Sequence, residues 1–218
     1  MVKNYSEFRT KLLQKINKNR KKLGVHDEYI FKHLNSESLC IDLGANVGKV
    51  TTKLRTYGSE VICFEPHPGA SKQLKNKFQT DTKVRILDAA ASDRNGTAKL
   101  FLHKDSIDTN DYGAFSESSS LVSTKVNVST NSYVNITEID IGEFVNTLPK
   151  RVNFMKIDVE GYEVGLLWRL ISSGAIHKID NIYVETHEEK VPWLFWKLLF
   201  LKTYLNVNGI KNVNFNWT

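Results

Sequence analysis

The sequence predicts an α/β fold of the Rossmann-like kind, with a mostly parallel central sheet and helices on both faces. Three observations support this prediction. Residues 40–48 have the sequence CIDLGANVG, in which an apolar strand runs into a glycine turn and then into a helix. Short apolar runs alternate with segments of helical spacing along most of the chain, as parallel strands with crossover helices require. Of five such apolar runs, four end in a charged residue, and the run at 84–91 carries Asp88.

The predicted elements follow from these patterns in chain order. The predicted strands are apolar runs at 39–42, 61–65, 84–91, 152–158 and 181–185. The predicted helices cover 47–57, 68–77, 141–148, 163–174 and 192–205. Pro66 and Pro68 favour the helix start at 68, and Gly174 favours a helix end. A predicted turn at 93–96 leads into a strand of alternating pattern at 97–103. Regular structure is predicted to resume at 133–140. A final strand is predicted at 213–217.

Residues 104–132 interrupt this alternation. The segment is rich in Ser, Thr, Asn and Asp and contains few large apolar side chains. Loops of this length are usually functional or disordered. We therefore predict a flexible flap over the active site.

The length and the charge distribution indicate one domain with a basic extension. The chain has 218 residues, enough for one α/β domain but hardly for two. Its first 22 residues hold eight Lys or Arg and one Glu, a local charge of +7 against +6 for the whole chain. Apolar residues there recur at helical spacing, so we predict a basic helical extension over 1–37 and a single domain over 38–218. The rest of the chain is slightly acidic, which makes a nucleic-acid partner unlikely.

The sequence indicates a cytoplasmic protein in a reducing compartment. No run of about 18 apolar residues predicts a transmembrane segment, and the polar N-terminus carries no secretory signal. Cys40 and Cys63 lie inside predicted strands, which indicates buried thiols rather than a disulfide or a metal pair. The apolar stretch 193–200 is expected to pack in the core or at a homodimer face, with an interfacial membrane contact as the alternative.

The glycine turn indicates S-adenosylmethionine rather than a dinucleotide. A dinucleotide site needs backbone N–H donors around a pyrophosphate and no adjacent carboxylate, whereas this turn has the pattern D-x-G-x-N-x-G with Asp42 at its start. S-adenosylmethionine has no phosphate, and its sulfonium and ammonium suit an acidic strand end. Gly44 is expected to allow close backbone approach, and Gly48 to let the helix lie against the strand. Glu65 follows Asp42 by 23 positions, at the strand end where an acid typically accepts ribose hydroxyls.

Charged residues stand at the carboxyl ends of four predicted strands, and Asp88 lies within the fifth. Open α/β sheets bind ligands at the carboxyl ends of their strands. Charged groups at the tips of buried strands are costly unless they are paired or functional. We expect them to converge on one rim, with Lys156 neutralising the neighbouring acids. The residues are Asp42, Glu65, Asp88, Lys156, Asp158, Glu160, Glu185 and His187.

Several of these segments together resemble the FkbM family of S-adenosylmethionine-dependent methyltransferases. They are DLGANVG at 42–48, FEPHP at 64–68, Ala89-Ala90 before the turn at 93–96, SSL at 119–121, KIDVEGYE at 156–163 and ETH at 185–187. The resemblance spans roughly residues 38–190 and does not cover 1–37 or 191–218. It implies a class I methyltransferase fold and methyl transfer to a hydroxyl of a sugar, a glycan or a related small molecule.

The resemblance and the strand ends together suggest two groups of site residues. The cofactor-binding candidates are Asp42, Gly44, Ala45, Asn46, Gly48, Glu65, Pro66, His67, Asp88, Ala89 and Ser119. The catalytic candidates are Asp158, Glu160, Glu185 and His187.

Two mechanisms fit these catalytic candidates. A sugar hydroxyl is a poor nucleophile at neutral pH, so the reaction needs a base or a metal. In the first arrangement, His187 or Asp158 is a general base held by Glu160 or Glu185. In the second, Asp158 and Glu185, with or without His187, bind Mg²⁺ or Mn²⁺. The first is slightly favoured.

Two alternative functions remain open from the sequence. The basic extension suggests an RNA methyltransferase, for which binding would depend steeply on salt. A domain that binds S-adenosylmethionine without catalysis would tolerate changes at the strand-end acids. An oxidoreductase is the least favoured because of the carboxylate at the glycine turn.

Overall fold

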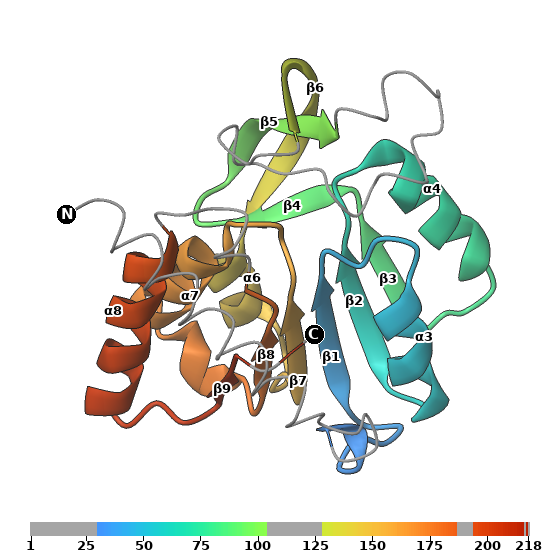
Figure 1. Ribbon diagram of the computed structural model, residues 1–218. Helices are drawn as coiled ribbons and strands as arrows, with labels where there is room; N and C mark the ends of the chain where they lie inside the picture. Colours follow the sequence, from blue (N-terminus) through green and yellow to red (C-terminus); the bar gives the residue numbers. More distant parts are fainter. Residues whose placement is uncertain (1–29, 104–127, 187–193, 216, 218) are drawn as a thin grey trace.

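The computed structural model describes residues 30–103, 128–186, 194–215 and 217. Its main element is a six-stranded parallel sheet in the order β3-β2-β1-β7-β8-β9 (Figure 1). The predicted α/β class and parallel central sheet are therefore confirmed. The strands are β1 (Leu39–Leu43), β2 (Glu60–Phe64), β3 (Val84–Leu87), β7 (Phe154–Ile157), β8 (Ile182–Val184) and β9 (Val213–Asn214).

Helices cover both faces of this sheet, as predicted (Figure 1). One apolar cluster joins the sheet to α3 and α4, and a second joins the opposite face to α6, α7 and α8. Cys40 and Cys63, in β1 and β2, are free and buried thiols, which confirms the expectation for them. The helices are α3 (Lys49–Thr56), α4 (Pro68–Lys77), α6 (Ile141–Thr147), α7 (Glu163–Ser172), the 3-10 turn η2 (Ala175–Lys178) and α8 (Leu194–Val207).

Strand β1 shows how the sheet is held between the two helical layers. Leu39, Ile41 and Leu43 pack in the cluster with α6, α7 and α8, whereas Cys40 packs in the cluster with α3 and α4. A strand that is buried on both faces is apolar almost throughout. Asp42 is the exception, and because it is fully buried it requires partners inside the protein.

A second sheet, which the sequence analysis did not predict, lies beside the carboxyl end of the first (Figure 1). The predicted strand 84–91 is two strands, because the chain leaves the main sheet at Asp88. β4 (Ala89–Ser92) pairs in parallel with β6 (Val128–Asp140), and β5 (Gly96–His103) pairs with β6 in antiparallel fashion. The expectation of parallel pairing is therefore wrong for β5. The small side chains of β4 are buried at every position, which allows close packing against β2 and α7.

Most other predicted boundaries agree with the structure to within a few residues. Two do not, since β6 begins at Val128 inside the predicted flap and β9 is shorter than predicted. Most of the predicted extension over 1–37 and the flap residues 104–127 lie outside the described residues. These segments, and the division of the chain into 1–37 and 38–218, therefore stay predictions.

Two glycines of the turn after β1 allow close packing of neighbouring elements. Gly44 has φ +74°, and a Cβ at this position would lie 1.9 Å from the carbonyl oxygen of Asp158, so the segment that approaches Gly44 closely is the backbone after β7. Gly48 has φ +79°, and a Cβ there would lie 2.5 Å from Leu74 and 2.8 Å from Phe78. Gly48 therefore permits close packing of the start of α3 against the end of α4, while α3 itself lies against β1 and β2 as expected.

We expect Gly44→Ala to destabilise the fold much more than Gly209→Ala. Gly209 also has a positive φ, +67°, but a Cβ there meets nothing within 4 Å. Gly209→Ala therefore adds only left-handed backbone strain, about 1–2 kcal/mol. Gly44→Ala adds the collision with Asp158, for which we expect at least about 2 kcal/mol more in urea unfolding. Equal losses for the two variants would contradict the close packing of the two loops.

Candidate active site

The candidate active site lies above β1 and β7, where the strand order of the main sheet reverses. From β1 the chain moves outward through β2 and β3, and from β7 it moves outward in the other direction through β8 and β9 (Figure 1). Open α/β sheets bind ligands in the crevice at the carboxyl side of such a switch point. Asp42 of β1 and Lys156 of β7 are direct partners across it.

The backbone N–H groups of the glycine turn point into the protein. Those of Gly44 and Ala45 donate to the carbonyl oxygen of Phe64 at 3.0 and 3.1 Å, and that of Asn46 donates to the Glu65 carboxylate at 2.8 Å. A pyrophosphate site would need such groups to face the ligand. Because the turn is closed onto the end of β2, its geometry favours a cofactor without phosphate.

Asp42 is held in the interior rather than at a ligand-facing surface. Its Oδ2 accepts a hydrogen bond from the Thr51 hydroxyl at 2.7 Å. Its Oδ1 accepts no hydrogen bond within the described residues and lies 3.6 Å from the Nζ of Lys156. The side chain is 0% exposed. Asp42 therefore acts as a buried counter-charge to Lys156, and any effect of Asp42 on a cofactor is transmitted by its neighbours.

Lys156 connects this buried acid to an accessible one. Its Nζ donates to the carbonyl oxygen of Gly44 at 3.0 Å and lies 3.1 Å from Oδ2 of Asp158, whose side chain is 25% exposed. Burial alone would lower the pKa of the ammonium, but the charges of Asp42, Asp158 and Glu185 outweigh it and hold the pKa of Lys156 above its usual range. The charged form of Lys156 is therefore favoured, and its contacts with Asp42 and Asp158 agree with its predicted role in neutralising the acids.

Glu65 ties the glycine turn to the turn after β2. Its Oε2 accepts the N–H of Asn46 and its Oε1 accepts the N–H of His67, both at 2.8 Å. Burial raises the pKa of Glu65 to about 7, although the two hydrogen bonds act in the opposite direction. Each carboxylate oxygen has a further lone pair, so the group can still accept a hydrogen bond from a ligand hydroxyl.

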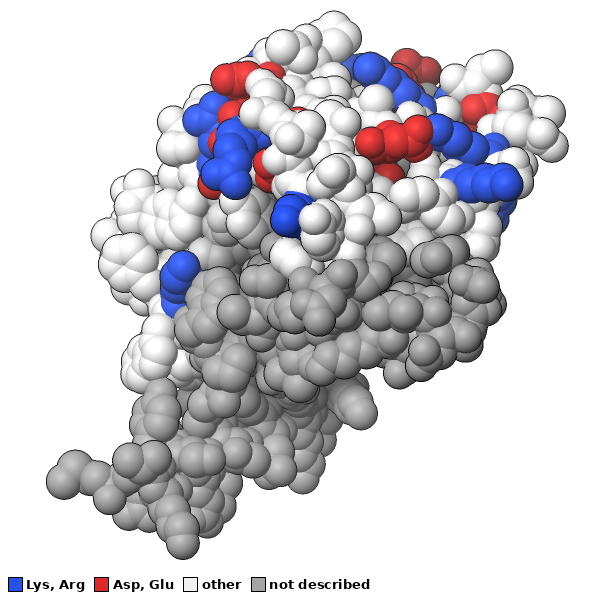
Figure 2. Space-filling model, turned by 90° about the horizontal axis from the view of Figure 1, so that it is seen from above, with Lys and Arg blue, Asp and Glu red and all other residues white. Residues whose placement is uncertain are grey.

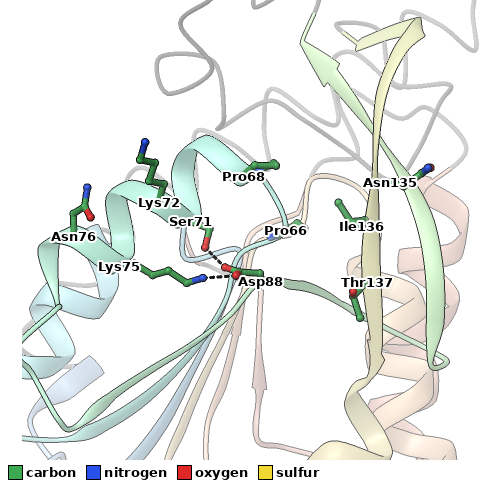
Figure 3. Close-up of a pocket in the computed structure, with 10 residues that line it drawn as sticks. All are labelled: Pro66, Pro68, Ser71, Lys72, Lys75, Asn76, Asp88, Asn135, Ile136 and Thr137. Carbon is green, nitrogen blue, oxygen red and sulfur yellow. Dashed lines mark hydrogen bonds and ion pairs between the residues drawn. The ribbon is translucent and has the colours of Figure 1, made fainter.

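A pocket of about 450 Å³ opens next to Pro66, between α4 and β6 (Figure 3). Asp88 lies in its wall, accepts a hydrogen bond from the Ser71 hydroxyl and forms an ion pair with Lys75. Burial alone would raise the pKa of Asp88, but the contacts with Lys75 and Ser71 lower it below its usual value. Thr137 and its neighbours on β6 form the opposite wall.

His67 and Ala89 have clear structural positions at the edge of this region. His67 is buried, and its Nδ1 accepts the N–H of Ala70 at 3.3 Å, so that it caps the start of α4. Burial lowers the pKa of His67, which keeps the ring neutral and Nδ1 free to accept. Ala89 is the first residue of β4 and is buried.

The turn after β7 is strained. Glu160 has φ +55°, in the left-handed region that residues other than glycine rarely adopt, and Gly161 follows with φ +113°. The N–H of Gly161 donates to Oε1 of the buried Glu163 at 2.8 Å, which fixes the turn to the start of α7. Strained residues cluster at functional sites because the surrounding structure must hold them in place.

The structure brings some of the predicted residues together and separates others. Asp42, Asp158 and Glu185 surround Lys156, and Asn46 and His67 hold Glu65. Asp88 lies apart from both groups, in the pocket beside α4. Ser119 and His187 lie outside the described residues, and their roles stay predictions.

Three residues that support the predicted acids were not singled out from the sequence. Thr51 holds Asp42, while Ser71 and Lys75 hold Asp88. Ser71 and Lys75 are four residues apart and therefore lie on one face of α4, which is a signal in the sequence. Thr51 gives no such signal, because its contact depends on how α3 lies over β1.

The charge around the rim is mixed. Figure 2 shows Lys and Arg side chains interspersed with Asp and Glu on the described part of the face seen from above. Nucleic-acid sites usually have a continuous basic surface instead. Among the described residues, no three His, Cys, Asp or Glu side chains form a group that could hold a metal ion.

The family is decided by a match over most of the chain. A family model described as the methyltransferase FkbM domain matches residues 42–209. The chain belongs to the FkbM methyltransferase family. The match begins at Asp42 and includes the turns after β1, β2 and β7, which together form the rim described above.

One solved structure supports the fold of this FkbM domain. A methyltransferase FkbM from Methylobacillus flagellatus KT is similar with a TM-score of 0.52 and 15% identity, over 83% of this chain and 40% of that one. The chain therefore spans less than half of that protein. A putative RNA methyltransferase from Pyrococcus horikoshii is similar with a TM-score of 0.37 and 13% identity, over 74% of this chain and 57% of that one, which is too weak for any inference. No curated protein matches the chain.

We expect the free energy of unfolding to fall as the pH rises through the titration of Glu65. The folded-state pKa of about 7 lies above the ordinary value of 4.5, so between these pH values the folded chain binds more protons than the unfolded chain. The slope of stability against pH is then negative in this window. Urea unfolding at about pH 5 and about pH 8 should show native FkbM protein losing more stability than Glu65→Gln, by on the order of a few kcal/mol. Parallel pH profiles would contradict the burial of an ionisable Glu65.

Proposed function

We propose that the protein is an S-adenosylmethionine-dependent O-methyltransferase that acts on a hydroxyl of a sugar, a glycan or a related small molecule. The observation that carries this proposal is the cluster of Asp42, Lys156 and Asp158 at the switch point of an FkbM domain. It presents one accessible carboxylate, held by a buried cation, at the edge where the fold binds its ligands.

The residues at the rim fit S-adenosylmethionine. The N–H groups of the glycine turn are used within the protein, so the site suits a cofactor without phosphate. Glu65 would accept the ribose hydroxyls through its remaining lone pairs. The pocket beside Pro66 and Asp88 would hold the adenine, with the Asp88 carboxylate as an acceptor for its amino group. When bound, S-adenosylmethionine supplies an electrophilic methyl group.

Asp158 is the group best placed to take the proton from the acceptor hydroxyl. Lys156 fixes the position of its Oδ2, and the other carboxylate oxygen can accept a hydrogen bond from the hydroxyl. Asp42 and Glu185 balance the charge of Lys156, so that the ammonium remains in place when Asp158 is protonated. Glu160 and His187 stay candidates for orienting the acceptor or for sharing the proton.

The position of Lys156 favours a general base over a metal. An ammonium already neutralises Asp158 and lies near Glu185, the two residues that a metal would need. A divalent cation between them would be repelled by this positive charge. We therefore propose that the reaction proceeds without Mg²⁺ or Mn²⁺ at these two residues.

Methyl-labelled S-adenosylmethionine and a panel of carbohydrates with free hydroxyls test this function. We expect label in a product that resists mild alkali and ribonuclease, as a methyl ether does, with no loss of rate in EDTA. Asp158→Asn should lower kcat by about 10²–10⁴ and leave cofactor affinity within a few-fold. The control is Asp180→Asn, which should keep the native rate. Asp180 is paired with Arg151 and lies just before β8, at the amino ends of the strands and away from the candidate site.

Three results would contradict the proposal. Label that is released by ribonuclease would identify an RNA methyltransferase. Activity that EDTA abolishes and Mg²⁺ restores would replace the base with a metal. Cofactor binding without transfer to any acceptor, in native protein and Asp158→Asn alike, would indicate a binding domain without catalysis.

A further inference from the structure

The outer face of α8 is unusually apolar. Of the five large apolar side chains that are exposed in the described part of the chain, four lie on this helix. Trp196 is 57% exposed, Leu199 47%, Phe200 66% and Val207 77%. Exposed apolar groups that gather on one element, unlike scattered ones, mark interaction surfaces.

This outer face is not needed to hold α8 on the protein. The opposite face carries Leu194, Leu198, Leu201 and Leu205, all buried, at the spacing of a helix that packs along one side. Trp168 of α7 adds aromatic contacts to this packing, 4.8 Å from the ring of Tyr204. Figure 1 shows α8 as the outermost helix on its side of the sheet. Of the outer side chains, Phe200 also contacts the Trp168 ring, with the ring centroids 5.9 Å apart, but it stays 66% exposed. The outer apolar side chains therefore remain largely exposed although the opposite face of α8 is buried.

The charge of this region has one sign. From residue 194 to residue 218 the sequence contains Lys197, Lys202 and Lys211 and no Asp or Glu. At 3.6 residues per turn, Lys197 and Lys202 fall on the two borders between the buried and the outer face of α8. Lys202 reaches toward the ring of Phe215, with its Nζ 4.6 Å from the ring centroid. Lysines that flank a stripe of Trp, Phe and Leu are typical of helices that lie in a membrane interface.

We infer that the outer face of α8 docks on an anionic phospholipid bilayer, with Trp196, Leu199, Phe200 and Val207 inserted below the headgroups. Pairing of this face with a second copy would bring the like charges of Lys197 and Lys202 from the two copies close together. Anionic lipid headgroups would instead attract these lysines. No helix in the described ranges is long and apolar enough to cross a bilayer, so the contact is with one leaflet.

Flotation of the full chain with vesicles tests this contact. We expect binding to vesicles of phosphatidylcholine mixed with phosphatidylglycerol and weak binding to phosphatidylcholine alone. Trp196→Ser with Phe200→Ser should weaken the binding by about tenfold or more, because both rings leave the interface. Tyr133→Ser is the matched control, since it removes an exposed aromatic ring from β6 and should bind as the native chain does. In native protein, brominated lipid should quench tryptophan fluorescence, and Trp196→Phe should lose most of that quenching while it still binds.

Three outcomes would overturn the inference. Unchanged binding of the double variant would place the contact elsewhere, as in the basic segment 1–22. Equal binding to both kinds of vesicle, or no binding to either, would show that α8 does not dock on an anionic lipid surface. A native dimer in solution that the double variant converts to a monomer would make a second copy the occupant of the face. Matching thermal unfolding of native and variant chains establishes that the exposed substitutions leave the fold intact.

Discussion

The contact between the Lys156 ammonium and the carboxylates of Asp42 and Asp158 is the constraint on which the active-site end of this fold depends. Asp42 and Lys156 are both buried, at positions that pair directly across β1 and β7. A buried charge is tolerated only with a close partner of opposite sign. Either residue alone would be a serious defect in the middle of the sheet, whereas together they fix the relative positions of the two strand ends.

The same contact explains the arrangement of the turns above it. Lys156 donates to the carbonyl oxygen of Gly44, and Gly44 is in turn packed against the carbonyl oxygen of Asp158. The turn after β1 therefore cannot open to cradle a phosphate, and its N–H groups are directed at the end of β2. Beside this turn lie the partly exposed carboxylate of Asp158 and the buried Glu65. The proposed function uses both features, the carboxylate as the base for the acceptor and the Glu65 region as the site for a nucleoside.

The sequence predicts this site to the extent that local patterns encode it. A strand, a polar tip and a glycine turn follow one another at 40–48, so the position of Asp42 at the rim is readable from the sequence alone. Its inward direction is not, because that depends on Thr51 and Lys156, which lie on other elements. The split at Asp88 was missed for a similar reason, since the small residues of β4 suit a strand of either sheet. Pairing of β5 with β6 joins residues far apart in the chain, and no short pattern specifies it.

The most direct test of this account is a double-mutant cycle on Lys156 and Asp42, followed by urea unfolding. Lys156→Met leaves Asp42 charged and buried without its partner, so we expect a loss of about 3–5 kcal/mol. Adding Asp42→Asn removes the stranded charge, and the double variant should be more stable than Lys156→Met alone. The Asp42→Asn single variant completes the cycle. If the loss of stability in the double variant equals the sum of the losses in the two single variants, the buried ion pair is not the contact that holds the strand ends together, and the account is contradicted.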